Sequence, residues 1–157
     1  MSGTLHLIHG YIGAGKTTFA KQLEEETEAI RFTLDEWMEN FYGHNPDAMK
    51  FDEYQTNCEN MILDILKSIL KHEQSAILDF GFWSKLKREN YRRFANENNA
   101  KTILYNLKCD DEIALKRTLR RTSEMPKGSL YIDENAYINL KTGFDPVEED
   151  ERCIIIY

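Results

Sequence analysis

The chain has 157 residues, of which 41% are hydrophobic and 30% charged, and its formal net charge is −7. This length and composition are typical of one globular domain that buries a core without disulfides, and we expect a single domain over residues 1–157. The acidic net charge argues against a polyanionic partner such as nucleic acid, which binds through positive surface.

No apolar run is long enough to cross a membrane, and residues 1–9 carry no basic leader. We therefore expect a cytoplasmic protein with no membrane partner. The cysteines Cys58, Cys109 and Cys153 are widely spaced and form no C-x-x-C pair. This pattern predicts neither a disulfide framework nor a zinc site.

Residues 4–9 alternate and then run apolar into a glycine-rich turn, which predicts a central strand of a parallel sheet. The turn, residues 10–18, fits the pattern G-x-x-x-x-G-K-[ST] and is called the glycine loop below. Its glycines allow successive N–H groups to converge on an anion at a helix N-terminus. The loop therefore predicts a nucleoside triphosphate site. The expected phosphate contacts are Gly10, Gly13, Ala14, Gly15, Lys16, Thr17 and Thr18.

Within this loop, we expect Lys16 to reach the β- and γ-phosphates and the Thr17 hydroxyl to bind Mg²⁺. A helix follows the loop, with apolar residues spaced along one face. Residues 29–34 read as a second strand that stops at Asp35, and residues 36–42 as a helix with an aromatic face. A Gly/Pro break over residues 43–46 precedes a long amphipathic helix, from about residue 47 to 72.

Residues 75–80 read as a third strand that carries Asp79 near its end. Ser84 is a credible N-cap for a basic helix over residues 85–97. The basic residues of this helix are interpreted as a solvated face, and the alternative is that they steer an anionic substrate. They are Lys85, Lys87, Arg88, Arg92 and Arg93.

A fourth strand is expected over residues 101–107. An acid-first helix then starts near Asp110 and carries Arg117, Arg120 and Arg121 toward its end. A loop with a proline and a glycine, a short helix capped by Asp133 and a last strand over residues 153–157 complete the chain.

Strands that alternate with helices predict crossover connections, and hence a parallel α/β sheet covered on both faces. Ligands of such sheets bind outside the carboxyl ends of the strands. The glycine loop, Asp35, Asp79 and the arginines all follow strands in this way. We therefore expect them to meet at one edge of the sheet.

Two acids have candidate roles at this edge. Asp79 resembles a Walker B carboxylate that holds Mg²⁺, and the alternative is an ordinary exposed strand-end residue. Asp35 could accept the proton of an attacking hydroxyl. The alternative is that Asp35 only caps the helix that begins at Glu36.

Arg117, Arg120 and Arg121 lie at i, i+3 and i+4, so one helical face is expected to carry three guanidinium groups. Such a face can neutralise phosphoryl charge, with a lid over about residues 117–131 closing on the nucleotide. The alternative is a basic last turn favoured by the helix dipole.

Several segments together resemble the small bacterial P-loop ATP-binding proteins, which are akin to the zeta toxins, chloramphenicol phosphotransferase and the kinase domain of polynucleotide kinase. The segments are residues 10–18, 33–38 (TLDEWM), 78–83 (LDFGFW), 120–121 and 144–151 (FDPVEEDE). The resemblance implies a three-layer, nucleoside-kinase-like P-loop fold with a five-stranded parallel sheet. It also implies ATP with Mg²⁺ and transfer of the γ-phosphate to a hydroxyl.

The resemblance places the general base on Asp35 and the lid arginines on Arg117 and Arg121, although the Arg-Asn pair often found there is Arg121-Thr122 in this chain. The leading hypothesis is an ATP-dependent kinase of a hydroxyl-bearing small molecule, with Lys16, Asp35, Arg117, Arg120 and Arg121 as catalytic residues. The alternatives are a non-catalytic ATP-binding switch module and a 5′-hydroxyl polynucleotide kinase. The net charge disfavours the last of these.

Overall fold

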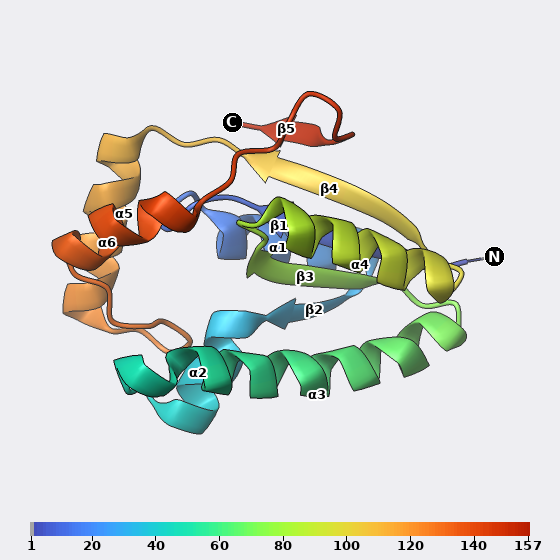
Figure 1. Cartoon of the computed structure of the whole chain (residues 1–157), viewed down its shortest axis with the longest axis horizontal. Helices are drawn as coiled ribbons and strands as arrows, with labels where there is room; N and C mark the ends of the chain where they lie inside the picture. The colour runs from blue at the N-terminus through green and yellow to red at the C-terminus, as the bar shows by residue number, and fades with distance from the viewer. Residues whose placement is uncertain (1) are drawn as a thin grey trace.

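A computed structural model describes residues 2–157, whose strands form one five-stranded sheet (Figure 1). Every strand pairs in parallel, and the order across the sheet is β2-β3-β1-β4-β5. The strands are β1 Thr4–His9, β2 Ile30–Thr33, β3 Ala76–Gly81, β4 Lys101–Leu107 and β5 Ile154–Ile156. All five strands expected from the sequence are confirmed, and β1, which carries the glycine loop, is central.

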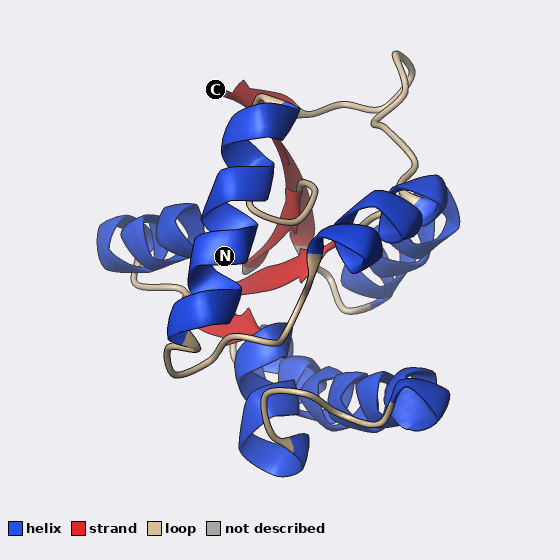
Figure 2. Cartoon of the chain, turned by 90° about the vertical axis from the view of Figure 1, so that its left-hand side faces the viewer, coloured by secondary structure: helices blue, strands red, loops and turns tan. Residues whose placement is uncertain are grey.

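Helices pack on both sides of this sheet (Figure 2). They are α1 Lys16–Thr27, α2 Leu34–Tyr42, α3 Phe51–Lys71, α4 Lys85–Glu97, α5 Asp111–Glu124 and α6 Glu134–Leu140. Two short 3₁₀ turns, Ala48–Lys50 and Lys141–Gly143, precede α3 and follow α6. Within residues 2–157, no helix combines the length and apolar character needed to span a bilayer.

The two faces of the sheet bury separate clusters. On one face, Ala20 and Leu23 of α1 pack with Ile77 of β3. On the other, side chains of α2, α3 and α4 enclose Leu5 and Leu7 of β1. The predicted three-layer α/β P-loop fold is confirmed.

Two of the predicted N-caps hold their helices as expected. The Ser84 hydroxyl accepts a hydrogen bond from Lys87 N at 3.3 Å, and the Asp133 carboxylate accepts one from Ala136 N at 2.8 Å. At the start of α5, the carboxylate of Asp110 accepts from two backbone N–H groups. These caps fix where each crossover helix begins, because they satisfy donors that have no partner inside the helix.

The interpretation of α4 as a solvated basic face is wrong for Arg88, which is fully buried. Its guanidinium donates to both carboxylate oxygens of Glu151, at 2.8 and 2.9 Å, and to the Phe82 carbonyl at 2.9 Å. It also donates to the carbonyls of Asp145 and Pro146. Arg88 thereby ties residues 144–151 across α4.

The neighbouring basic residues of α4 also have partners. Lys85 pairs with Glu148, Lys87 with Glu59, and Arg92 with Glu151. The sequence holds one sign of this arrangement, because Arg88 lies on the same helical face as the buried Tyr91 and Ala95. Glu59 belongs to α3, whereas Glu148 and Glu151 come from a segment more than fifty residues away in the chain, which leaves no local pattern.

The Arg88–Glu151 pair should make stability depend on acid. Hydrogen bonds from Arg88 lower the pKa of Glu151 from 4.5 to about 2. A carboxyl group whose pKa is lower in the folded state contributes stability that is complete above its unfolded pKa and is lost as the pH falls toward its folded pKa. We expect the free energy of unfolding, measured with urea, to fall between pH 5 and pH 2.

Glu151→Gln should remove part of that slope and destabilise the chain at pH 7, since Arg88 would lose its charged partner. Glu25→Gln is the matched control, because Glu25 is exposed on α1. An identical pH slope in wild type and Glu151→Gln would show that the pair does not stabilise the fold.

Candidate active site

The glycine loop connects the end of β1 to the start of α1. Gly13 and Gly15 have φ angles of 77° and 91°, which glycine adopts without strain. A Cβ on Gly13 would also lie 2.3 Å from the carbonyl oxygen of Ala114 in α5, so no side chain fits there. Gly15 is the N-cap of α1 and supplies no side-chain cap. The first N–H groups of α1 are therefore left without a side-chain partner. They form the positive end of the helix dipole, which favours an anion.

The Lys16 side chain folds back onto the backbone of the glycine loop. Its ammonium group donates to the Tyr11 carbonyl at 2.7 Å. Desolvation lowers the pKa of Lys16, while the nearby carboxylates of Asp79 and Asp35 oppose that shift. The structure therefore places the loop lysine in the field of both acids that the sequence singled out.

Asp79 is buried at the end of β3, with 5% of its surface exposed. Its Oδ2 accepts hydrogen bonds from the Thr17 hydroxyl at 2.7 Å and the Thr33 hydroxyl at 3.0 Å. The alternative of an exposed strand-end residue is wrong for Asp79. The carboxylate instead joins the start of α1 to the end of β2.

The oxygens of Thr17 and Asp79 are hard donors of the kind that Mg²⁺ prefers. Among residues 2–157 there is no cluster of three or more His, Cys, Asp or Glu side chains that could enclose a metal. A two-residue oxygen set fits Mg²⁺, because this ion commonly binds through one or two protein oxygens, waters and substrate phosphates.

Asp35 does not cap a helix. α2 begins at Leu34, its N-cap is Thr33, and Asp35 lies in its first turn. Residue Asp35 is solvent-exposed, yet its carboxylate lies among enough protein that desolvation raises its pKa. Lys16 and Arg121 oppose this shift, while Asp79 adds to it. Because its surface is exposed, Asp35 can meet a molecule that enters from solvent.

The three arginines of α5 do not act as one set. Arg117 and Arg121 line a pocket of about 530 Å³ together with Gly13, Gly15 and Thr18. Arg120 is instead paired with Glu124 on the exposed face of the helix. The expectation of three guanidinium groups on one face is therefore corrected for Arg120. The cause is angular, because positions 120 and 121 are about 100° apart around a helix.

The loop after α5 lies against the segment that follows α2. His44 Nδ1 donates to the Ser129 carbonyl at 2.7 Å, and the His44 carbonyl accepts from Tyr131 N at 2.7 Å. A Cβ on Gly128 would lie 2.8 Å from Glu36 Cγ, so the two segments touch directly. Sequence reasoning missed this contact, since neither His44 nor Ser129 belongs to a recognisable motif.

A family model described as an AAA domain matches residues 5–137, which is most of the chain. The chain belongs to this AAA-domain family. A search of curated proteins finds no match.

Solved structures share the fold of this family member at low sequence identity. A candidate kinase from Chloroflexus aurantiacus has a TM-score of 0.81 and 18% identity over 99% of this chain and 88% of its own. A gluconokinase from Sinorhizobium meliloti has a TM-score of 0.65 and 13% identity over 99% and 82%. A chain of the Pnkp1/Rnl/Hen1 RNA repair complex has a TM-score of 0.73 and 20% identity over 90% and 44%. These likenesses establish the fold.

Thr33 is a further residue of the site that sequence reasoning missed. It is 3% exposed, donates to Asp79, and accepts from Arg31 Nη1 at 2.5 Å. Arg31 in turn pairs with Glu24 and Glu36. The Thr33 hydroxyl therefore orients the Asp79 carboxylate from the end of β2. The available sequence signal was the position of Thr33, two residues before Asp35 at the end of the second predicted strand.

Replacing Thr33 by valine keeps the shape and the strand preference but removes the hydroxyl. We expect the affinity for Mg²⁺ in the presence of ATP to fall about 10–100-fold, because partners that orient a metal ligand have effects of that size. Calorimetric titration of ATP at a series of Mg²⁺ concentrations measures this. Thr102→Val in β4 is the matched control, and equal Mg²⁺ dependence in both variants would contradict the role of Thr33.

Proposed function

We propose that this chain is an ATP- and Mg²⁺-dependent phosphotransferase that moves the γ-phosphate to a hydroxyl of a small molecule. The observation that carries the proposal is the placement of Asp35. It lies across the strand ends from the glycine loop, where the charges of Lys16, Asp79 and Arg121 all act on it. A nucleotide-binding module needs the loop, but it has no need of a second, solvent-accessible carboxylate at this position.

In the proposed reaction, Gly10, Gly13 to Thr18 and the Lys16 ammonium bind the phosphates of ATP. The pocket lined by Arg117 and Arg121 takes the nucleoside end. Thr17 and Asp79 would hold Mg²⁺, which when bound neutralises phosphate charge. Oxygen ligands from the phosphates would complete its coordination.

Asp35 would orient the acceptor hydroxyl and accept its proton. The acceptor oxygen forms a bond to the γ-phosphorus, the bond from that phosphorus to the β–γ bridging oxygen breaks, and ADP leaves. Arg121 stabilises negative charge on the transferring group, because a guanidinium is well suited to phosphate oxygens. A raised pKa suits Asp35 for this work, since a base is most effective when its pKa approaches the working pH.

Replacing Asp35 by asparagine should lower kcat by about 10²–10⁴-fold and leave ATP binding nearly unchanged. The free energy of unfolding should not fall, because the folded state raises the pKa of Asp35 and so disfavours its charge above the unfolded pKa. Coupled ADP release, calorimetry and urea unfolding measure these three quantities. Asp52→Asn, the first-turn acid of α3, is the control.

A loss of stability without a loss of transfer in Asp35→Asn would contradict the catalytic role. The pH profile gives an independent reading. Because the pKa of Asp35 is raised, kcat/KM should fall on the acid side at a pH above the usual Asp value of about 3.9.

Lys16→Ala should abolish nucleotide turnover, since the ammonium group is the loop's only side-chain cation for the β- and γ-phosphates in the described residues. Assaying ADP release with a panel of sugars, nucleosides and antibiotics identifies the acceptor class. Tight ATP binding with no transfer to any of them would favour the alternative of a switch module.

A 5′-hydroxyl polynucleotide acceptor remains the second enzymatic candidate, because a chain of an RNA repair complex shares the fold. The net charge of −7 weighs against it. Oligonucleotide binding that weakens steeply with salt, together with phosphorylation of a 5′-hydroxyl oligonucleotide, would replace the small-molecule proposal.

A further inference from the structure

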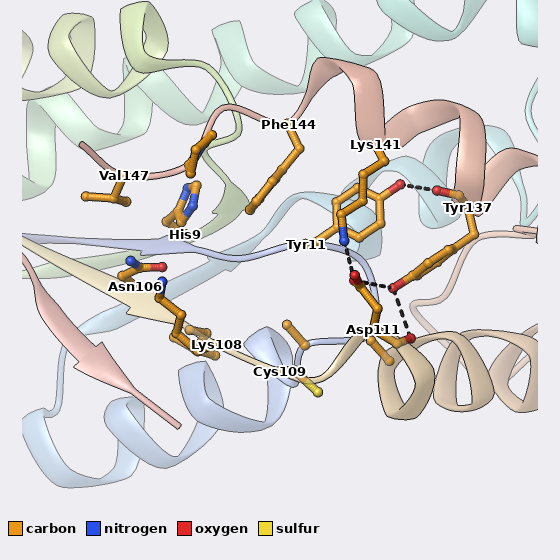
Figure 3. A pocket seen from close by; sticks show the side chains of 14 residues that line it. His9, Tyr11, Asn106, Lys108, Cys109, Asp111, Tyr137, Lys141, Phe144 and Val147 are labelled. Carbon is orange, nitrogen blue, oxygen red and sulfur yellow. Dashed lines mark hydrogen bonds and ion pairs between the residues drawn. The ribbon is translucent and has the colours of Figure 1, made fainter. Parts of the chain in front are cut away.

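A second, smaller pocket lies at the carboxyl ends of β1 and β4 (Figure 3), next to the pocket lined by Arg117 and Arg121. Its volume is about 120 Å³. The proposed reaction uses neither of the two buried polar side chains in its wall, His9 and Asn106. His9 is 1% exposed and Asn106 is 7% exposed.

These two side chains are neighbours by the geometry of the sheet. His9 and Asn106 are paired in register on adjacent parallel strands, so both point to the same face, about 4.8 Å apart along the sheet. Both line the pocket. Figure 3 shows both toward one end of it, with Phe144 next to His9 and Tyr11 farther along the pocket.

His9 presents a hydrogen-bond acceptor. Its Nδ1 lies 2.9 Å from the Phe82 carbonyl oxygen, which can only accept, so the proton is on Nδ1. Burial lowers the pKa of His9 to about 4, and the ring is neutral near pH 7 with a lone pair on Nε2. Within residues 2–157 the structure gives this nitrogen no hydrogen-bond partner.

Asn106 presents both a donor and an acceptor. Neither atom of its side-chain amide has a hydrogen-bond partner in the described part of the chain. Arg92 Nη2 is the one fully enclosed polar side-chain atom left unpaired among residues 2–157. The free atoms of His9 and Asn106 are therefore not sealed in the core and remain accessible from the pocket.

The rest of the pocket is mainly aromatic and aliphatic. The Phe144 ring stacks on His9 with centroids 4.9 Å apart, and Tyr11 meets Phe144 edge to face at 5.3 Å. Val147 and Pro146 complete this wall. At the rim, Lys141 is paired with Asp111, so their charges are mutually compensated.

We propose that this pocket binds a small, neutral, planar carboxamide or lactam. The N–H of such a group donates to His9 Nε2, its carbonyl accepts from the Asn106 amide, and its ring lies against Tyr11 and Phe144. The pocket, at about 120 Å³, is smaller than the cavity of about 150 Å³ that encloses benzene, but it opens to solvent, so the ring of the ligand would lie partly at its mouth. A neutral ligand matches the uncharged His9 and Asn106. Because Lys108 also lines the pocket, tighter binding of nicotinate than of nicotinamide would contradict this choice.

The site would adjoin the nucleotide site, because the walls of both pockets include Ala14, Leu107 and Lys108. Tyr11 and Ala14 belong to the glycine loop and line the pocket, and the Tyr11 carbonyl accepts from Lys16. The walls of the 530 Å³ pocket include Thr18, Phe19 and Gln22, on the α1 face of the sheet. We therefore expect occupancy of the carboxamide pocket to be compatible with bound ATP.

Nicotinamide and methyl nicotinate are a matched pair of probes, because they share a ring and a carbonyl while only nicotinamide has the amide N–H. Ligand-observed NMR titration of the full chain with saturating ATP and Mg²⁺ measures both dissociation constants. We expect saturable binding of nicotinamide and at least about tenfold weaker binding of methyl nicotinate, the effect of one hydrogen bond to a buried partner.

Asn106→Leu should weaken nicotinamide at least about tenfold, because it removes both amide atoms at similar volume. Asn60→Leu, which removes an exposed amide of α3 that lines neither pocket, should leave nicotinamide binding unchanged. Displacement by ATP, equal binding of the two probes, no saturable nicotinamide binding, or unaltered binding to Asn106→Leu would each overturn the proposal. If Asn106→Leu does not fold, the comparison of the two probes on the wild-type chain decides.

Discussion

The buried carboxylate of Asp79 holds the functional edge of the sheet together. One oxygen accepts hydrogen bonds from Thr17 at the start of α1 and from Thr33 at the end of β2. A buried ionised group is costly unless it is hydrogen-bonded, so these hydroxyls must stay in place for the fold to keep the charge. The glycine loop and the turn into α2 are thereby held at a fixed separation, which also places Asp35 relative to Lys16.

The layered fold, the succession of strands and helices along the chain and the phosphate-binding loop could be predicted because their causes are local. Hydrophobic periodicity, caps such as Ser84 and the spacing of Gly10, Gly15 and Lys16 are each contained in a short stretch. The roles of Thr33, Arg88 and His44 could not be predicted in this way. Their partners are Asp79, Glu151 and Ser129, which lie 46 to 85 positions away and meet them only after the sheet has formed.

Arg88 also connects the fold to the second pocket. By pairing with Glu151 and binding the carbonyls of Asp145 and Pro146, it keeps residues 144–151 over the ends of the strands. Phe144 and Val147 of that segment form one wall of the pocket beside His9. A buried ion pair contributes little net stability when compared with apolar residues of similar volume, but it is specific in direction. Here the fixed geometry of the Arg88–Glu151 pair sets the position of Phe144 and Val147 in the pocket wall.

The contact between the loop after α5 and the segment after α2 has a kinetic consequence. His44 bonds to Ser129 and Tyr131, while Gly128 abuts Glu36, so the loop that follows α5 and the segment around α2 are joined directly. Neither segment can swing outward alone while these bonds persist. A molecule that enters or leaves between these two segments would require them to move as one body, or the His44 hydrogen bonds to break first. The exchange of such a molecule with solvent would then depend on how often these bonds break.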